Sequence, residues 1–326
     1  MNILQWDIFF IWSIYYTPSQ YIILLRTVRH MELLLNRIFT PKDCCNVDEL
    51  LVYGKYIIFI KNSIKGSKIT AYNIDLGNSK SILMKNQICF NSYTDNINIV
   101  FETSGIKRGI VILDVCTMTT KIIDNLGMDF FLGGINKGRL ILRCGYNIFL
   151  YDINTCKKKI LASSHNIFGT PVIEEDICAW LIYFKDKCCI VIYDISKDIN
   201  IVFTPTGFIN KMFILQDTIV YQTCDANKCF VYTYNIEGRE LKKCTEAMNW
   251  IDIYKGQNGI YAWTERKCRN NVYIFDVFVY KIYNQKRKKV LEDCKSPIFP
   301  VISDNFIFLI ESGSIRDELY TTKIDL

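Results

Sequence analysis

Short apolar runs alternate with polar turns along most of the chain, and one such run ends in a phrase that recurs. The residues LYDINT at 150–155 form an apolar segment that ends in an aspartate and a turn. With this copy included, the chain contains seven related phrases, and their polar second residues lie 38 to 46 positions apart. These residues are Asn73, Asp114, Asp152, Asp194, Asn235, Lys281 and Lys323. A period of about 40 residues predicts a repeat array.

The pattern within each repeat predicts four strands. Two apolar runs around a tight polar turn precede the phrase, as at 169–173 and 177–183 on either side of 174–176. The composition agrees, because half of the residues are hydrophobic and the 20 Tyr and 20 Phe favour strands. No long segment after residue 45 keeps a helical period. A further strand follows six of the phrases, at 80–84, 120–123, 157–161, 200–203, 240–244 and 286–291.

The seventh phrase is not followed by such a strand, but the segment 33–41 can supply one. It ends in IFTP, which matches the VFTP at 202–205 in the strand after the fourth phrase. We therefore expect 33–41 to complete the seventh sheet and close a ring, since an open array would leave a long unpaired edge. The prediction is an all-β, seven-bladed β-propeller over 33–326, closed by this N-terminal strand. An open solenoid is the alternative, but it would need capping repeats, and the sequence shows none.

The expected blades span 47–84, 87–123, 127–161, 166–204, 208–244, 247–291, and 296–326 together with 33–41. The phrases LYDINT at 150–155 and IYDISK at 192–197 resemble the repeat ends of WD40-type and TolB-like propellers. This resemblance covers 33–326 and implies the propeller fold. It implies no particular member, because the Gly-His and Trp-Asp pairs of WD40 repeats and the Ser-Pro-Asp-Gly turn of TolB-like repeats are absent. The SDN at 303–305 is only a faint echo of that turn.

Residues 1–32 stand apart as an apolar N-terminal extension. The apolar runs 8–16 and 21–25 are separated by TPSQ, so 8–25 is only marginally long enough to cross a bilayer. We expect a helical extension outside the propeller. A weak anchor within residues 1–25 and a translation start at Met31 are the alternatives. No convincing signal peptide precedes the repeats, so a cytoplasmic location is expected, with membrane association through the N-terminus as the alternative.

The chemistry-bearing residues point away from metals, cofactors and disulfides. Most of the 14 cysteines lie in apolar runs, where a free thiol acts as a small hydrophobe, and we expect them to stay reduced. The adjacent pairs at 44–45 and 188–189 are poor zinc ligands, and no C-x-x-C pair exists. Only His30 and His165 could act as histidine bases, and His165 is read as a polar turn residue. We therefore expect no cofactor and no metal.

No catalytic signature is found either, whether a G-x-S-x-G elbow or a phosphate-binding glycine loop. The recurring Asp114, Asp152 and Asp194 are predicted to bond the backbone of the turn that follows them. The enzyme alternative is a propeller hydrolase or lyase with carboxylates in the central channel. Its candidate residues are Asp48, Asp129 and Asp252.

The loops between the second and third strands carry an excess of positive charge at least as large as that of the whole chain. They hold thirteen Lys or Arg against six Asp or Glu, while the whole chain has a net charge of +6. Such a face attracts acidic partners over long range. The candidate partner-binding residues are Lys61, Lys65, Lys107, Arg108, Arg143, Lys187, Lys228, Arg266, Lys267, Arg269, Arg316 and Trp250.

We therefore expect a monomeric, non-enzymatic binding or scaffold propeller whose partner is an acidic protein or peptide. A membrane-tethered sensor is a further alternative and depends on residues 1–25. Nucleic acid is not expected, because the basic runs at 157–159 and 286–289 lack interleaved aromatic residues. Each run opens an outer strand, where lysines guard an exposed edge.

Overall fold

The computed structural model describes residues 49–323, apart from 54–55, 74–75, 77, 96, 106–107, 124–129, 185–186, 226–227, 248–250, 257–258, 271, 295–296, 304–305 and 312–317. The predicted N-terminal extension and the closing strand at 33–41 lie outside these residues. The described chain is all β, as predicted, and none of it forms a helix with the length and apolar character of a membrane span.

The strands of the first four sheets follow each other along the chain with short connections. The first sheet contains β1 (Glu49–Tyr53), β2 (Tyr56–Ser63), β3 (Gly66–Asn73) and β4 (Asn78–Lys85). The second contains β5 (Gln87–Thr94), β6 (Ile99–Gly105), β7 (Gly109–Asp114) and β8 (Thr119–Ile123). The third contains β9 (Phe130–Asn136), β10 (Arg139–Cys144), β11 (Asn147–Asp152) and β12 (Lys158–Ser163). The fourth contains β13 (Ile167–Glu174), β14 (Ile177–Phe184), β15 (Lys187–Asp194) and β16 (Ile199–Phe203).

The remaining strands build three more sheets, of which the last has three strands within the described residues. The fifth sheet contains β17 (Ile209–Leu215), β18 (Thr218–Cys224), β19 (Cys229–Asn235) and β20 (Glu240–Ala247). The sixth contains β21 (Ile251–Lys255), β22 (Ile260–Arg269), β23 (Val272–Lys281) and β24 (Lys286–Cys294). The seventh contains β25 (Pro297–Ser303), β26 (Phe306–Glu311) and β27 (Glu318–Lys323).

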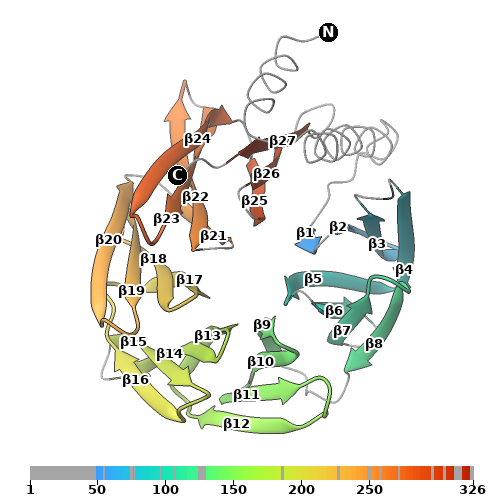
Figure 1. Cartoon of the computed structure of the whole chain (residues 1–326), viewed down its shortest axis with the longest axis horizontal. Coiled ribbons are helices and arrows are strands. Elements are labelled where there is room, and N and C mark those ends of the chain that lie inside the picture. The colour runs from blue at the N-terminus through green and yellow to red at the C-terminus, as the bar shows by residue number, and fades with distance from the viewer. Residues whose placement is uncertain are drawn as a thin grey trace, which may run out of the picture.

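The sheets stand radially around a central axis, with the first strand of each nearest to the axis (Figure 1). Each of these inner strands contacts the inner strand of the next sheet, and β25 contacts β1. All pairings within a sheet are antiparallel between neighbours in sequence, as at β14–β15 and β22–β23. This is the architecture of a β-propeller. The sheets coincide with the sequence repeats, one sheet for each recurring phrase.

The hydrophobic core is divided into clusters that each lie between two neighbouring sheets. One cluster joins the third sheet to the fourth through Ile141, Ile148 and Trp180, and another joins the fifth to the sixth through Val220 and Trp263. A middle strand therefore packs against an apolar neighbour on both of its faces. In β15, for example, every residue from Cys188 to Tyr193 is buried. This explains why a middle strand such as β15 reads as a continuous apolar run rather than as an alternating one.

Two faces of the ring follow from this strand order. The connector face carries the links from one sheet to the next, such as 204–208, and the loops between the second and third strands. The turn face carries the other hairpin turns, such as 175–176 and 153–157.

On the turn face, the recurring aspartates bond the backbone as predicted. Asp152 Oδ1 accepts hydrogen bonds from the amides of Asn154 at 2.9 Å and Thr155 at 2.8 Å. Asp114 and Asp194 bond the amides two and three residues further on in the same way. The recurring phrase is therefore a structural unit: a strand and the turn that leaves it.

Ion pairs join separate sheets on the turn face. Lys255 Nζ lies 2.5 Å from Glu174 Oε2 and connects the inner strand of the sixth sheet to that of the fourth. Arg139 bonds Asp176 at 2.8 Å across the third and fourth sheets. Lys255 and Arg139 thus both have acidic partners on the turn face.

One expectation about the cysteines is wrong. Cys224 and Cys229 form a disulfide. The two residues stand directly opposite each other in the β18–β19 ladder, with Cα atoms 4.2 Å apart. Side chains at opposed positions of an antiparallel ladder share one face of the sheet, which brings these two sulfurs together.

Candidate partner-binding face

The predicted basic residues within the described part of the chain gather on the connector face, because each lies in or next to a loop between the second and third strands of a sheet. Lys107, Trp250 and Arg316 lie outside the described residues. The other nine divide into those that have an acidic partner and those that do not.

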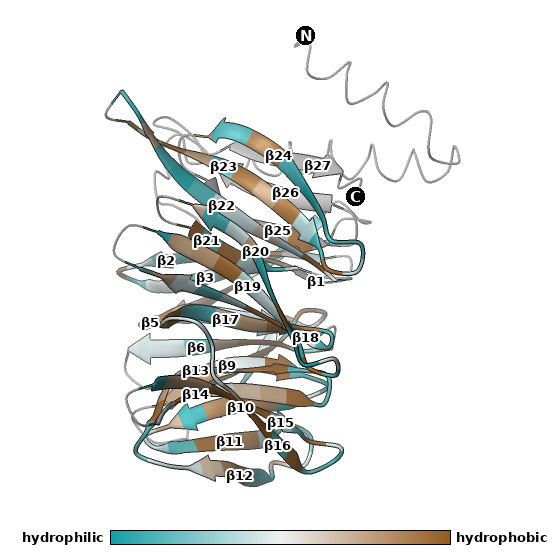
Figure 2. Ribbon diagram, turned by 90° about the vertical axis from the view of Figure 1, so that its left-hand side faces the viewer, coloured by the Kyte–Doolittle hydropathy of each residue, from teal (hydrophilic) through white to brown (hydrophobic). Residues whose placement is uncertain are grey.

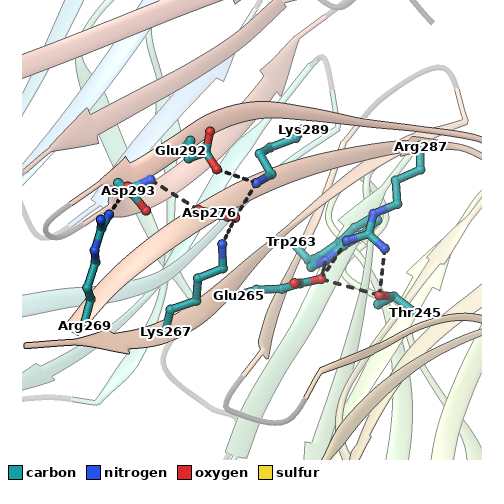
Figure 3. Close-up of polar contacts among 10 residues, drawn as sticks. All are labelled: Thr245, Trp263, Glu265, Lys267, Arg269, Asp276, Arg287, Lys289, Glu292 and Asp293. Carbon is teal, nitrogen blue, oxygen red and sulfur yellow. Dashed lines mark hydrogen bonds and ion pairs between the residues drawn. The ribbon is translucent and has the colours of Figure 1, made fainter.

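In the sixth sheet, two of the three candidate cations, Lys267 and Arg269, are paired. The strands β22 and β23 are ten residues long, and their hydrophilic tip extends beyond the neighbouring hairpins (Figure 2). Lys267 Nζ lies 2.5 Å and Lys289 Nζ 2.8 Å from Asp276 Oδ2, and Arg269 lies 3.4 Å from Asp293 (Figure 3). Asp276 is fully buried. Burial alone would raise its pKa, but the hydrogen bonds from the two lysines outweigh that effect and hold the pKa below 3.8.

A second polar cluster lies beside this one (Figure 3). Glu265 Oε1 accepts hydrogen bonds from Trp263 Nε1 at 2.7 Å and from Arg287 at 3.1 Å. The Arg287 guanidinium also lies over the ring of Phe278, 4.1 Å from its centroid. The basic run at 286–289 does lie on the outer strand of its sheet. The run is nevertheless more than a solvated edge, because Arg287 bonds Glu265 of β22 and Lys289 bonds Asp276 of β23.

In the fifth sheet, Lys228 bonds Glu246 at 2.6 Å. A count of the charges in the loops could not predict these ion pairs, because the acids that pair with the loop cations lie in strands. The sequence did hold a signal for one of them. Asp276 sits inside an otherwise apolar strand, and a buried carboxylate needs a paired cation.

The second and third sheets contain an arrangement that we call the arginine cluster: Glu102, Arg108, Phe130, Phe131 and Arg143. Arg108 donates a hydrogen bond to the Phe130 carbonyl oxygen at 2.6 Å, and its guanidinium lies 3.7 Å from Glu102 Oε2. Glu102 is 1% exposed, and Oε1 accepts the amide of Leu132 at 2.8 Å. Burial raises the pKa of Glu102, against the opposing effect of these hydrogen bonds and of Arg108.

Arg143 is the unusual member of the arginine cluster. Its guanidinium lies 4.3 Å from the centroid of the Phe131 ring, which is 37% exposed. The side chain is half-buried, and burial lowers its pKa, yet a guanidinium stays charged at neutral pH. Among the described residues, Arg143 has neither an acidic partner nor a hydrogen-bond acceptor. A charge that is partly removed from water and lacks a counter-ion is a ready site for an anionic group.

The remaining candidates are more exposed. Arg266 lies over the Tyr273 ring at 4.7 Å. Lys61, Lys65 and Lys187 have no acidic partner among the described residues. The unpaired cations of this face therefore lie mainly in the first four sheets, and the paired ones in the fifth and sixth.

The enzyme alternative names three carboxylates, and one of them lies within the described residues. Asp48 and Asp129 lie outside the described residues, and Asp252 is paired with Lys211 at 2.8 Å. His165 lies against the Tyr146 ring at 4.1 Å. No group of three or more His, Cys, Asp or Glu side chains in the described part of the chain could hold a metal ion.

Comparisons with known proteins bear on the fold. No protein-family model matches the sequence, and neither does any curated protein. Oligogalacturonate lyase in complex with manganese is similar in structure, with a TM-score of 0.63 at 11% identity, over 88% of this chain and 92% of that one. The β-propeller domain of the Trilobed protease from Pyrococcus furiosus is also similar in structure, with a TM-score of 0.63 at 10% identity, over 85% of this chain and 95% of that one.

The acylaminoacyl peptidase from Pyrococcus horikoshii gives a TM-score of 0.64 at 9% identity, over 86% of this chain and 52% of that one. The chain thus spans about half the length of this peptidase. At such identities the likeness concerns the fold and carries no activity with it. It supports the predicted architecture: the chain has the β-propeller fold.

Proposed function

We propose that this propeller is a non-enzymatic binding module that holds an acidic segment of a protein partner on its connector face, at the arginine cluster. The observation that carries the proposal is Arg143, a half-buried guanidinium stacked on Phe131 without an acidic partner among the described residues. An arginine in this state can bind a carboxylate through two parallel hydrogen bonds.

The surroundings of Arg143 support this role. The Phe131 ring limits the orientations of the guanidinium plane, and Arg108 is held beside it by the Phe130 carbonyl and Glu102. Side chains that are already ordered lose less conformational entropy when a ligand binds. Lys267 and Arg269 are weaker candidates, because an acidic ligand would have to compete with Asp276 and Asp293 for them.

The test is selection from a library of random peptides displayed on phage, followed by binding measurements on the selected peptides. We expect enrichment of Asp and Glu. Arg143→Glu should weaken binding about tenfold to a hundredfold, since a hydrogen bond to a charged group contributes about 1.5–3 kcal/mol. Arg143→Lys should lose part of the affinity, because lysine keeps the charge but not the paired geometry.

The matched control is Lys121→Glu, which reverses an exposed charge on the outer strand β8. It should leave binding unchanged. Selected peptides without an acidic bias, or equal binding by the Arg143→Glu variant, would overturn the proposal.

A further inference from the structure

A pocket of about 410 Å³ opens on the connector face between the fourth and fifth sheets. It lies between the β14–β15 hairpin and the connection at 204–208. Its lining includes Tyr183, Lys187, Cys188, Thr204, Pro205 and Phe208. This volume falls within the range of about 300–1,000 Å³ that is usual for ligand pockets.

Two aromatic rings of the pocket are partly exposed to solvent. Tyr183 is 41% and Phe208 48% exposed, although both side chains are large and hydrophobic. Phe168, which is half-buried, lies against both of them, with ring centroids 5.0 Å from Tyr183 and 5.9 Å from Phe208. The rings of Tyr183 and Phe208 are 6.3 Å apart. The pocket therefore presents apolar surface that is shaped by ring packing in the free protein.

The backbone around the pocket is also constrained. The Tyr183 amide donates to the Asn166 carbonyl at 2.8 Å, which ties β14 to the link before β13. Pro205 is buried, and Gly207 has a φ of +81°, where a Cβ would lie 3.4 Å from Thr223 Cβ. Glycine is suited to this left-handed position. A connection that is held in place in this way keeps Phe208 at the pocket wall.

The charge beside the pocket bears on which ligand would fit it. Lys187 is exposed at its rim and has no acidic partner among the described residues. The pocket lies on the same face as the arginine cluster, one sheet further along the ring from Arg143. Apolar walls with an unpaired cation at the rim complement a ring that is flanked by a carboxylate.

We infer that this pocket binds an aromatic side chain of the acidic segment, with an adjacent Asp or Glu facing Lys187. The inference rests on the proposed function and specifies the ligand further: the partner's segment is acidic and carries an aromatic residue. Arg143 and the pocket would then hold two different parts of one peptide.

The experiment uses the full chain and fluorescein-labelled synthetic peptides, acetylated and amidated at their ends. One peptide has a central Phe flanked on both sides by Glu and Asp, and the second has Ala in place of Phe. We expect the Phe peptide to bind about tenfold more tightly, which is the scale expected for burying one aromatic side chain. Phe208→Ala should abolish this preference and leave the affinity for the Ala peptide unchanged. Phe208 is exposed, so its replacement should leave the fold intact, which circular dichroism can verify.

Lys187→Glu provides a second variant, and it should weaken the Phe peptide more than a peptide whose acids are kept away from the ring. Equal binding of the Phe and Ala peptides to the unmodified protein would overturn the inference. A Phe208→Ala variant that binds neither peptide would also overturn it. The same holds if light scattering shows a dimer that Phe208→Ala dissociates, since a second copy of the chain would then fill the pocket.

The two proposals fail in different ways. If Arg143→Glu leaves both peptides unaffected while Phe208→Ala removes the Phe preference, the pocket is supported and the arginine cluster is not. If Arg143→Glu weakens both peptides equally and no Phe preference exists, the reverse holds. If neither peptide binds, both proposals are wrong.

Discussion

At the scale of single residues, the recurring aspartates show how one side chain sets a turn. Asp114, Asp152 and Asp194 each receive two backbone amides, and the turns then end in left-handed residues other than glycine at Met118, Cys156 and Asp198. A left-handed backbone is unfavourable for such residues. The hydrogen bonds from the aspartate help to offset that cost and hold the turn closed.

We predict that Asp194→Ala lowers the free energy of unfolding by about 1 kcal/mol at neutral pH, the usual contribution of such a hydrogen bond. The hydrogen bond from the Ser196 hydroxyl, with those from Lys197, lowers the pKa of Asp194 to about 2. A lowered pKa stabilises the folded state above the usual value of 3.8 and ceases to do so as pH falls through the folded value. Denaturant titrations should therefore show the difference from the unmodified protein shrinking between about pH 4 and about pH 2. A difference that grows on acidification would contradict this account.

At the scale of elements, the strands β22, β23 and β24 are joined by charge as well as by their ladders. Glu265 and Asp276 stand directly opposite each other in the β22–β23 register. Like charges at opposed positions repel. The repulsion is relieved because the two acids turn to different cations, Glu265 to Arg287 and Asp276 to Lys267 and Lys289. The basic run on β24 is thus part of the structure of this sheet.

We predict that replacing both Lys267 and Lys289 with Met destabilises the protein by about 3 kcal/mol, because it leaves the Asp276 carboxylate buried without a counter-ion. Urea unfolding measures the effect. Arg269→Met removes a similar ion pair whose two members are exposed, and it should change stability by less than about 1 kcal/mol. Equal effects of the two changes would show that the burial of Asp276 does not matter.

The β18–β19 hairpin gives a third stability prediction. The Cys224–Cys229 disulfide closes only a short loop. In the chain-entropy description, a loop of this length contributes about 2 kcal/mol. Cys224→Ser with Cys229→Ser should cost that amount, and dithiothreitol should reproduce the loss in the unmodified protein but have no effect on the double variant. An effect of dithiothreitol on the variant would point to another disulfide.

At the scale of the whole molecule, the sequence predicted the architecture well and the site only in part. The repeat spacing and the turn aspartates follow from local chemistry, which the order of residues displays directly. The pairing of Lys267 with Asp276, by contrast, depends on strand register and on which side chains face each other. The same is true of the pocket around Phe208, which combines residues of two sheets. The disulfide was missed because composition indicates an average cysteine environment and not an opposed pair.

The matched charges of the turn face have a consequence for encounter kinetics. Lys255 and Arg139 already have acids beside them, whereas Arg143 and Lys187 have no acidic partner within the described part of the chain. The proposed acidic partner would then be drawn toward one side of the ring before any contact forms. Salt would slow this approach by screening, and it would have less effect on how long a docked segment stays bound.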